Sequence, residues 1–252
     1  MVVRAVRRGA LYSAGNSWSR VMNDLKQIAK RIPVVGPLLR SIHQKTLRRK
    51  DPPFSSEAYW QNRYEGGGNS GAGSYGRLAQ FKAEFLNAIV AENDVKSVIE
   101  YGCGDGNQLS LANYPKYLGF DVSERAVQMC RERFDGDGTK SFALVQENRG
   151  ESADLTMSLD VIFHLVEDRV FEDYMHRLFD SAERFVIIYS LNKKEAPSDE
   201  LGSHMIYRKF TDWVTQNKTE WELADVIPNR YPYVDNEENE SFSDFFIFKN
   251  RV

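Results

Sequence analysis

Between residues 97 and 190 the sequence alternates short apolar runs with longer amphipathic stretches, and this alternation limits the fold more than any other feature. The apolar runs are rich in β-branched side chains and are predicted strands, at 97–101, 117–121, 141–146, 154–160 and 184–190. The amphipathic stretches are predicted helices, at 78–93, 107–114, 123–134 and 168–179. Strands that alternate with helices of this length pair in parallel and connect by right-handed crossovers.

The end of the chain departs from this alternation. Two apolar runs, 221–228 and 241–250, follow each other with only the acidic loop 229–240 between them. Because no helix connects them, they are expected to pair antiparallel at one edge of the sheet. The predicted fold class is therefore α/β: a Rossmann-like, doubly wound, mostly parallel seven-stranded sheet with an antiparallel C-terminal strand, preceded by a basic N-terminal arm.

The basic arm is defined by charge. Residues 1–50 contain 12 Lys and Arg and one acid, a net charge of +11, so the remaining 202 residues carry −14. The predicted organisation is a basic arm over 1–54 and a globular domain over 55–252. A solvated tail, contact with an anionic membrane surface and organellar targeting are alternatives for the arm. Its longest apolar run, 32–39, is broken by prolines and is too short to cross a bilayer.

Cysteine usage limits the compartment and the chemistry. Cys103 and Cys130 lie on different predicted elements and form neither a disulfide framework nor a metal-ligand spacing. We therefore expect a cytoplasmic protein, with the membrane surface as an alternative through the arm, and no metal site. The sequence does not determine the oligomeric state.

The first predicted strand runs into the glycine-rich turn Gly102-Cys103-Gly104-Asp105-Gly106. In an open α/β sheet the ligand lies outside the carboxyl ends of the strands, and glycines let the backbone approach it. Asp121 ends the next strand, where a carboxylate can accept both hydroxyls of a ribose. This arrangement predicts a nucleoside-containing ligand.

A dinucleotide and a sulfonium nucleoside both fit that description, but charge distinguishes them. The dinucleotide pattern needs its third glycine at 107, where Asn107 stands. Glu100 and Asp105 place negative charge on both sides of the turn, which disfavours a diphosphate. The same carboxylates suit a ligand with an ammonium and a sulfonium, as S-adenosylmethionine has.

The stretches "VIEYGCGDG" and "YLGFDVS" resemble motifs of the class I S-adenosylmethionine-dependent methyltransferases. The resemblance covers about residues 55–250 and implies an antiparallel final strand. It implies that Gly102 and Gly104 line the methionine part of the cofactor. It also implies that Glu100 orients the cofactor amine and that Asp121 holds the ribose.

Several further residues are assigned to the cofactor site. Trp60, on a short helix before the core, is expected to cover the cofactor, with core packing as the alternative. The segment 66–76 contains six glycines and is expected to be a flexible lid. Ser158, at the end of the fourth strand, is expected beside the cofactor. Gln146 and Glu147 stand where the family's acidic adenine contact would be.

The acceptor side carries the predicted catalytic residues. His164 follows the fourth strand and is the candidate general base, with a space-filling role as the alternative. His204 is a second catalytic candidate. It lies four residues before Arg208, on the same face if a helix begins early enough. Arg208 is predicted to hold an anionic group of the substrate, and solvated surface is the alternative for both residues.

The segments "SGAGSYGR", "SLDVIFHLVED" and "HMIYRKFTDWV" are similar to bacterial methyltransferases encoded among glycan and polysaccharide genes. This similarity implies methyl transfer to a hydroxyl of a small molecule or glycan. One alternative is a nucleic-acid or protein methyltransferase delivered by the basic arm. Nucleic acid is disfavoured because the catalytic part carries −14 and lacks an Asn/Asp-Pro-Pro-Tyr/Phe motif. The other alternative is a non-catalytic scaffold that keeps the cofactor fold.

Overall fold

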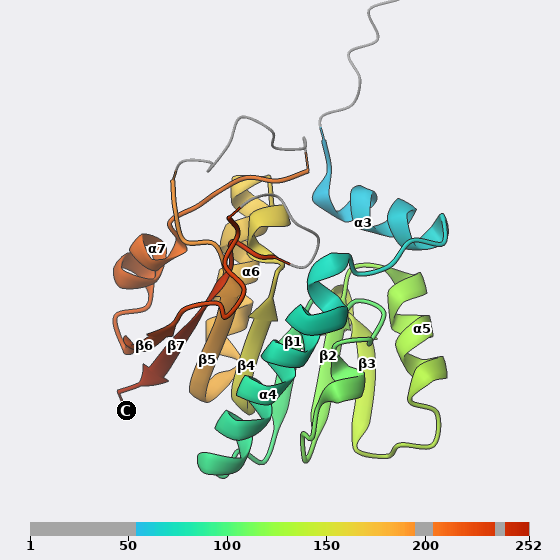
Figure 1. The fold of residues 1–252 in the computed structure, drawn as a ribbon, viewed down its shortest axis with the longest axis horizontal. Helices are drawn as coiled ribbons and strands as arrows, with labels where there is room; N and C mark the ends of the chain where they lie inside the picture. The colour runs from blue at the N-terminus through green and yellow to red at the C-terminus, as the bar shows by residue number, and fades with distance from the viewer. Residues whose placement is uncertain (1–53, 195–203, 235–239, 252) are drawn as a thin grey trace, which may run out of the picture. The chain divides into compact units, whose positions relative to one another are not determined.

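The computed structural model describes residues 54–194, 204–234 and 240–251. They form one seven-stranded sheet in the order β3-β2-β1-β4-β5-β7-β6 (Figure 1). The strands are β1 (Val98–Tyr101), β2 (Tyr117–Asp121), β3 (Lys140–Leu144), β4 (Ala153–Leu159), β5 (Ala182–Ser190), β6 (Trp221–Ile227) and β7 (Asp244–Asn250). Strands β1 to β5 pair in parallel, and β7 pairs antiparallel with both β5 and β6. The predicted fold class is confirmed.

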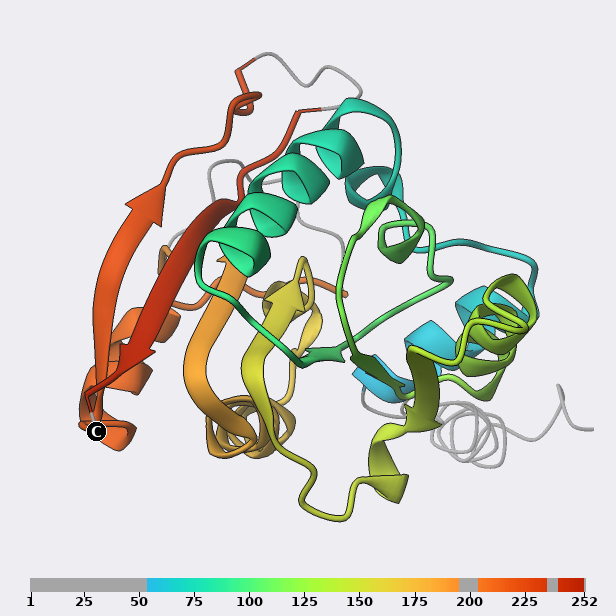
Figure 2. The ribbon, with the colours of Figure 1, turned by 90° about the horizontal axis from the view of Figure 1, so that it is seen from below.

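Helices cover both faces of this sheet, and each face has its own hydrophobic core. The helices are α3 (Ser56–Glu65), α4 (Gly76–Glu92), α5 (Glu124–Arg133), α6 (Asp168–Asp180) and α7 (Phe210–Asn217). Leu86 of α4 and Val127 of α5 belong to one core, whereas Met175 of α6 and Phe210 of α7 belong to the other. Figure 2 shows α4 and α6 on opposite sides of the strands. The winding is therefore double, as the alternation predicts.

Serine side chains fix the starts of two helices. Ser55 Oγ accepts a hydrogen bond from the Ala58 N–H at 3.2 Å, and Ser123 Oγ accepts one from the Ala126 N–H at 3.3 Å. These caps begin α3 and α5. The first orients the segment that precedes the core, and the second begins the helix that follows Asp121.

The predicted helix over 107–114 is wrong, because only a short 3-10 turn, Leu109–Leu111, forms there. The Asn87 side chain of α4 donates to the Leu111 carbonyl at 3.0 Å and accepts from the Asn113 N–H at 2.8 Å. Asn87 therefore hydrogen-bonds a carbonyl and an N–H that a helix over 107–114 would use for its own backbone bonds. Tertiary contact with α4 overrides the local helical pattern.

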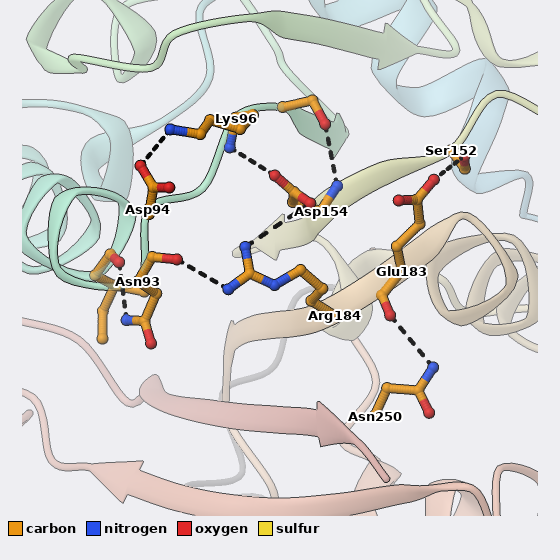
Figure 3. Close-up of polar contacts among 10 residues, drawn as sticks. Asn93, Asp94, Lys96, Ser152, Asp154, Glu183, Arg184 and Asn250 are labelled. Atoms are coloured by element: carbon orange, nitrogen blue, oxygen red, sulfur yellow. Dashed lines mark hydrogen bonds and ion pairs between the residues drawn. The ribbon is translucent and has the colours of Figure 1, made fainter. Parts of the chain in front are cut away.

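Polar residues also gather at the amino ends of the strands, where they bind one another (Figure 3). Asp154, in β4, accepts from the Lys96 N–H at 2.6 Å and lies 3.8 Å from Arg184 Nη1. Arg184 Nη2 donates to the Asn93 carbonyl at 2.9 Å. These contacts join the end of α4 to β4 and β5. Polar pairs therefore stabilise the amino ends of these strands, and the cavity described below lies at the carboxyl ends.

Several predictions lie outside the described residues. These include nearly all of the basic arm and its proposed contact with a membrane or targeting machinery, which stay predictions. They also include residues 195–203, because the polar loop that follows the fifth strand is expected to border the acceptor. Within 54–251, leaving out the undescribed gaps, no helix has the length and apolar character needed to cross a bilayer.

Candidate active site

A cavity of about 560 Å³ lies at the carboxyl ends of β1, β2 and β4, within the size range of small-molecule sites. One wall is the glycine turn after β1, and another is the face of α3 that carries Trp60 and Tyr64. Figure 1 shows α3 above this end of the sheet. The cavity therefore occupies the place that the strand order predicts for a ligand.

The glycines of the turn let other parts of the chain pack against it. Gly102 and Gly104 have φ angles of 90° and 58°, which other residues rarely adopt. A Cβ atom on Gly102 would lie 2.4 Å from Val161 Cγ2, and one on Gly104 would lie 2.2 Å from Ser70 Oγ. Both glycines also line the cavity, and their contact with a cofactor stays a prediction. The sequence did not indicate their packing role.

Glu100 and Asp121 present buried carboxylates to the cavity. Glu100 accepts from the Tyr117 hydroxyl at 2.6 Å, and burial raises its pKa to about 7 against the opposing effects of Tyr117 and Lys82. Asp121 accepts from the N–H groups of Gly104 and Ser123, both at 2.9 Å. Each carboxylate keeps free lone pairs for a donor on a ligand.

Gln108 supplies a further acceptor that the sequence analysis missed. Its Nε2 donates to the Ala79 carbonyl at 3.0 Å, which fixes the orientation of the amide. Its Oε1 is buried and has no hydrogen-bond partner within the described part of the chain. The residue is 8% exposed and lines the cavity. A buried acceptor of this kind requires a donor, so a ligand with an ammonium or hydroxyl group fits here.

Asp105, predicted at the cofactor, does not line the cavity. It is fully buried and accepts from the Ser70 N–H at 3.1 Å, the Tyr75 hydroxyl at 2.7 Å and the Asn107 N–H at 2.9 Å. These bonds hold the glycine-rich segment 66–76 against the turn. The segment that was expected to be a flexible lid is therefore tied to the site by Asp105.

Helix α3 is joined across the cavity to the loop before α6. The Ser56 N–H donates to Glu167 Oε1 at 2.9 Å, and the Ser56 hydroxyl bonds to Glu167 Oε2. The Val166 N–H donates back to Ser56 Oγ at 3.1 Å. Trp60 lines the cavity rather than either hydrophobic core. Its position fits the predicted cover, and the bonds between Ser56 and Glu167 fix the helix that carries it.

His164 lies in the turn after β4 and lines the cavity. Its Nδ1 is 3.2 Å from the carbonyl oxygen of His204, which can only accept, so Nδ1 carries the hydrogen. Nε2 is then the atom with the free lone pair, and among the described residues nothing bonds to it. Burial lowers the pKa of His164 to about 4, so the ring is neutral at pH 7.

His204 does not line the cavity and supports His164 instead. Its ring stacks on His164 with a centroid distance of 5.5 Å and on Tyr59 with one of 4.7 Å. The expected helical face shared with Arg208 is wrong, because α7 begins only at Phe210. Arg208 also lies outside the lining. Its Nη2 is 2.7 Å from Asp168 and donates to the Val166 carbonyl at 3.0 Å, so it anchors the loop before α6.

Two of the other cofactor candidates are turned away. Ser158 is fully buried and its hydroxyl lies 2.7 Å from the Tyr174 hydroxyl, so it belongs to the core beneath the cavity. Glu147 accepts from the Leu144 N–H at 2.9 Å and does not line the cavity. Gln146 does line it. Of the two stand-ins for the adenine contact, Gln146 is therefore the one in reach of a ligand.

A buried ion pair at the cavity wall was not predicted. Lys82 is fully buried, and its Nζ lies 2.8 Å from Asp160 Oδ2. Asp160 directly follows β4, lines the cavity and has a φ angle of 59°. The available signal was a lysine on the face of the 78–93 helix otherwise occupied by Leu78 and Phe85.

Three solved structures are similar to this chain. The N-methyltransferase NodS from Bradyrhizobium japonicum, in complex with S-adenosyl-L-homocysteine, has a TM-score of 0.60 and 12% identity over 79% of this chain and 100% of its own. Magnesium protoporphyrin IX methyltransferase from Synechocystis has a TM-score of 0.55 and 17% identity over 77% of this chain and 97% of its own. The methyltransferase domain of bacterial CtHen1 has a TM-score of 0.53 and 21% identity over 69% of this chain and 100% of its own. At these identities the likeness shows the fold.

The fold and a family model together define the class of protein as a methyltransferase with a Rossmann-like sheet. A family model described as a methyltransferase domain matches residues 92–234, more than half of the chain, and the protein belongs to that family. No curated protein matches the chain. The non-catalytic scaffold is thereby set aside in favour of an enzyme.

Proposed function

We propose that the protein transfers the methyl group of S-adenosylmethionine to a hydroxyl of a small molecule or glycan, with His164 as the general base. The observation that carries this proposal is the bond between His164 Nδ1 and the His204 carbonyl. It fixes the tautomer in which Nε2 has a free lone pair, on a residue that lines the cavity. A neutral imidazole with this lone pair at the cavity can take the proton that the hydroxyl loses as it is methylated.

The cavity residues fit the cofactor by their chemistry. Glu100 and Gln108 Oε1 offer acceptors for its ammonium, and Asp121 offers acceptors for its ribose hydroxyls. Gln146 is in reach of its adenine. When bound, the cofactor supplies an electrophilic methyl group on a sulfonium. The main contribution of the protein is to hold the acceptor hydroxyl in line with that methyl.

In this proposal His164 takes the proton of the acceptor hydroxyl. When the acceptor oxygen takes the methyl group, the bond between that methyl and sulfur would break and leave S-adenosylhomocysteine. The hydroxyl proton would pass to Nε2 of His164 and later leave to solvent. His204 acts through its carbonyl and its stacked ring, so in this proposal it is a positioning residue. Arg208 pairs with Asp168 and stabilises the loop before α6, and in this proposal it does not bind a substrate anion.

The acceptor class rests on the similarity to glycan-associated methyltransferases, because the fold does not select an acceptor. The structural neighbours are described as an N-methyltransferase and a porphyrin methyltransferase, which act on unlike acceptors. The proposed location is the cytoplasm, with the basic residues 1–50 at a membrane surface where envelope glycans are assembled.

Two experiments test this function. Calorimetric titration of the full chain with S-adenosylmethionine and with NAD should give binding of the first alone, and heat from NAD alone would refute the cofactor assignment. Incubation with methyl-labelled cofactor and a cell-envelope glycan fraction, RNA or protein should label the glycan. Label confined to RNA or protein would refute the acceptor class.

The role of His164 is tested by His164→Gln, which keeps a polar side chain but removes the base. We expect kcat to fall by about 10²- to 10⁴-fold with cofactor affinity unchanged. The matched control is His176→Gln, on the exposed side of α6. In the parent enzyme saturated with S-adenosylmethionine, the acidic fall of kcat/KM for the glycan should lie near pH 4, the lowered pKa of His164, rather than near 6.5. Full turnover in His164→Gln would show that another group takes the proton.

A further inference from the structure

Three segments of the chain converge on Asp160, two on its carboxylate and one on its backbone N–H. Lys82 Nζ, from α4, donates to Oδ2 at 2.8 Å, and Ser243 Oγ, from the segment before β7, donates to Oδ1 at 2.8 Å. The Asp160 N–H donates to the Tyr189 carbonyl of β5 at 2.8 Å. The backbone is held in the left-handed region, at a φ angle of 59°. Such strain persists only where the surroundings enforce it, and it is common at functional sites.

The accessible part of this cluster is the carboxylate, not the lysine. The Asp160 side chain is 18% exposed and lines the cavity, whereas the Lys82 side chain is fully buried and does not line it. The ammonium also lies 5.1 Å from the centre of the Tyr189 ring. An ion pair that served only to join α4 to β4 would not need to present its acceptor to a ligand site.

The glycine-rich segment leaves space for this carboxylate. A Cβ atom on Gly73 would lie 2.7 Å from Asp160 Oδ2. Only glycine permits that approach, so the segment 66–76 packs directly beside the acid. Two of the lone pairs on the carboxylate are used by Lys82 and Ser243, and the others remain for donors in the cavity.

Resting on the proposed function, we infer that Asp160 is the residue that selects the acceptor, by accepting hydrogen bonds from hydroxyl groups next to the one that is methylated. Asp160 and His164 both follow β4 and both line the cavity. Because Lys82 balances the charge of Asp160, the pair offers acceptor oxygens without net negative charge. This combination suits the neighbouring hydroxyls of a neutral sugar better than an amine.

The test uses the double variant Lys82→Met/Asp160→Asn in the full chain, which removes both charges together and leaves no unpaired buried ion. The probe is the cell-envelope glycan fraction with labelled S-adenosylmethionine. With saturating S-adenosylmethionine, we expect the apparent KM for the glycan to rise about 10- to 100-fold, as for loss of a hydrogen bond to a charged group. Cofactor affinity should fall only as far as loss of the Lys82 charge raises the pKa of Glu100. The matched control is Asp154→Asn/Arg184→Met, which removes the ion pair at the other end of β4 (Figure 3) and should leave KM unchanged.

The second variant, Gly73→Ala, keeps both charges but moves the carboxylate. It should also raise KM for the glycan while cofactor affinity holds. An unchanged KM in both variants would refute the role of Asp160 while leaving the proposed function in place. A parallel loss of cofactor affinity and thermal stability would show that the cluster is structural and would also refute it. If the parent enzyme labels no glycan, the proposed function fails and this inference fails with it.

Discussion

Cofactor binding should release a proton from Glu100. Burial raises its pKa to about 7 in the protein without ligand. A cationic ammonium placed against the carboxylate favours the charged form and lowers that pKa. At pH 6 about 0.9 of the Glu100 side chains are protonated before binding, by the ordinary titration relation, and nearly all must ionise on binding. Affinity for the cofactor should therefore weaken about tenfold for each pH unit below 7.

The assay is calorimetric titration with S-adenosylmethionine at pH 6 in two buffers of different ionisation enthalpy. The difference between the two heats gives the number of protons released, which should be about 0.9. At pH 6 the amino group of the ligand is already fully protonated, so it contributes nothing. Glu100→Gln should bind with equal heats in both buffers. Equal heats in the parent protein would refute the contact between Glu100 and the ammonium.

The same group affects stability in the absence of ligand. Since its folded-state pKa of about 7 exceeds the ordinary value of 4.5, the folded protein binds more protons between these values. The Glu100 contribution to the free energy of unfolding is present below pH 4.5 and is lost as the pH rises through 7. His164, whose pKa is lowered to about 4, acts in the opposite sense between 4 and 6.5. Comparison of Glu100→Gln with the parent across this range isolates the effect of Glu100.

The remaining predictions concern packing around the cavity. Gly102→Ala should cost about 2–5 kcal/mol by urea denaturation, because its Cβ would lie 2.4 Å from Val161 at a φ angle of 90°. Gly136→Ala, with a φ angle of 82° and nothing within 4 Å, should cost only the backbone strain of about 1–2 kcal/mol, and equal losses would contradict the clash. Glu167→Gln weakens the bonds to Ser56 that hold α3, so cofactor release measured by stopped flow should be about tenfold faster. An unchanged release rate would show that these bonds do not close the site.

The parallel sheet and the glycine turn could be predicted because each depends on local pattern. β-branched runs alternating with amphipathic helices determine a parallel sheet, and a parallel sheet determines where a ligand lies. Glu100, Gly102 and Asp121 follow from their positions at strand ends. The antiparallel pairing of the last two strands follows from the missing helix between them.

The residues that sequence reasoning misjudged depend on long-range contacts. Asp105 was assigned to the cofactor by its charge, but three donors from 70–107 satisfy it. Arg208 was assigned to the substrate, but it pairs with Asp168, which lies 40 positions earlier. A sequence shows which side chains carry charge and does not show which charges are already paired.

Lys82 illustrates the opposite error. It lies on the apolar face of α4, and no role was predicted for it. A lysine that is fully buried nevertheless needs a charged partner. Sequence spacing does not identify that partner, because Asp160 lies 78 positions away and reaches it only through the parallel pairing of β4. A basic residue on the otherwise apolar face of a predicted helix therefore indicates that an acid should be sought at the carboxyl end of a neighbouring strand.

The charge of the cavity lining also affects how tightly the cofactor and its product bind. Among the described residues that line the cavity there is one arginine, Arg177, and there are five acids besides Asp160, whose charge Lys82 balances; they are Glu57, Glu100, Asp121, Glu167 and Asp173. An acidic lining attracts a sulfonium more strongly than a neutral thioether, because methyl transfer removes the positive charge from sulfur. The residues that hold the cofactor therefore hold its product less well, and this difference favours product release. Added salt should weaken binding of S-adenosylmethionine more than binding of S-adenosylhomocysteine, and equal salt dependence in calorimetric titration would refute this electrostatic account.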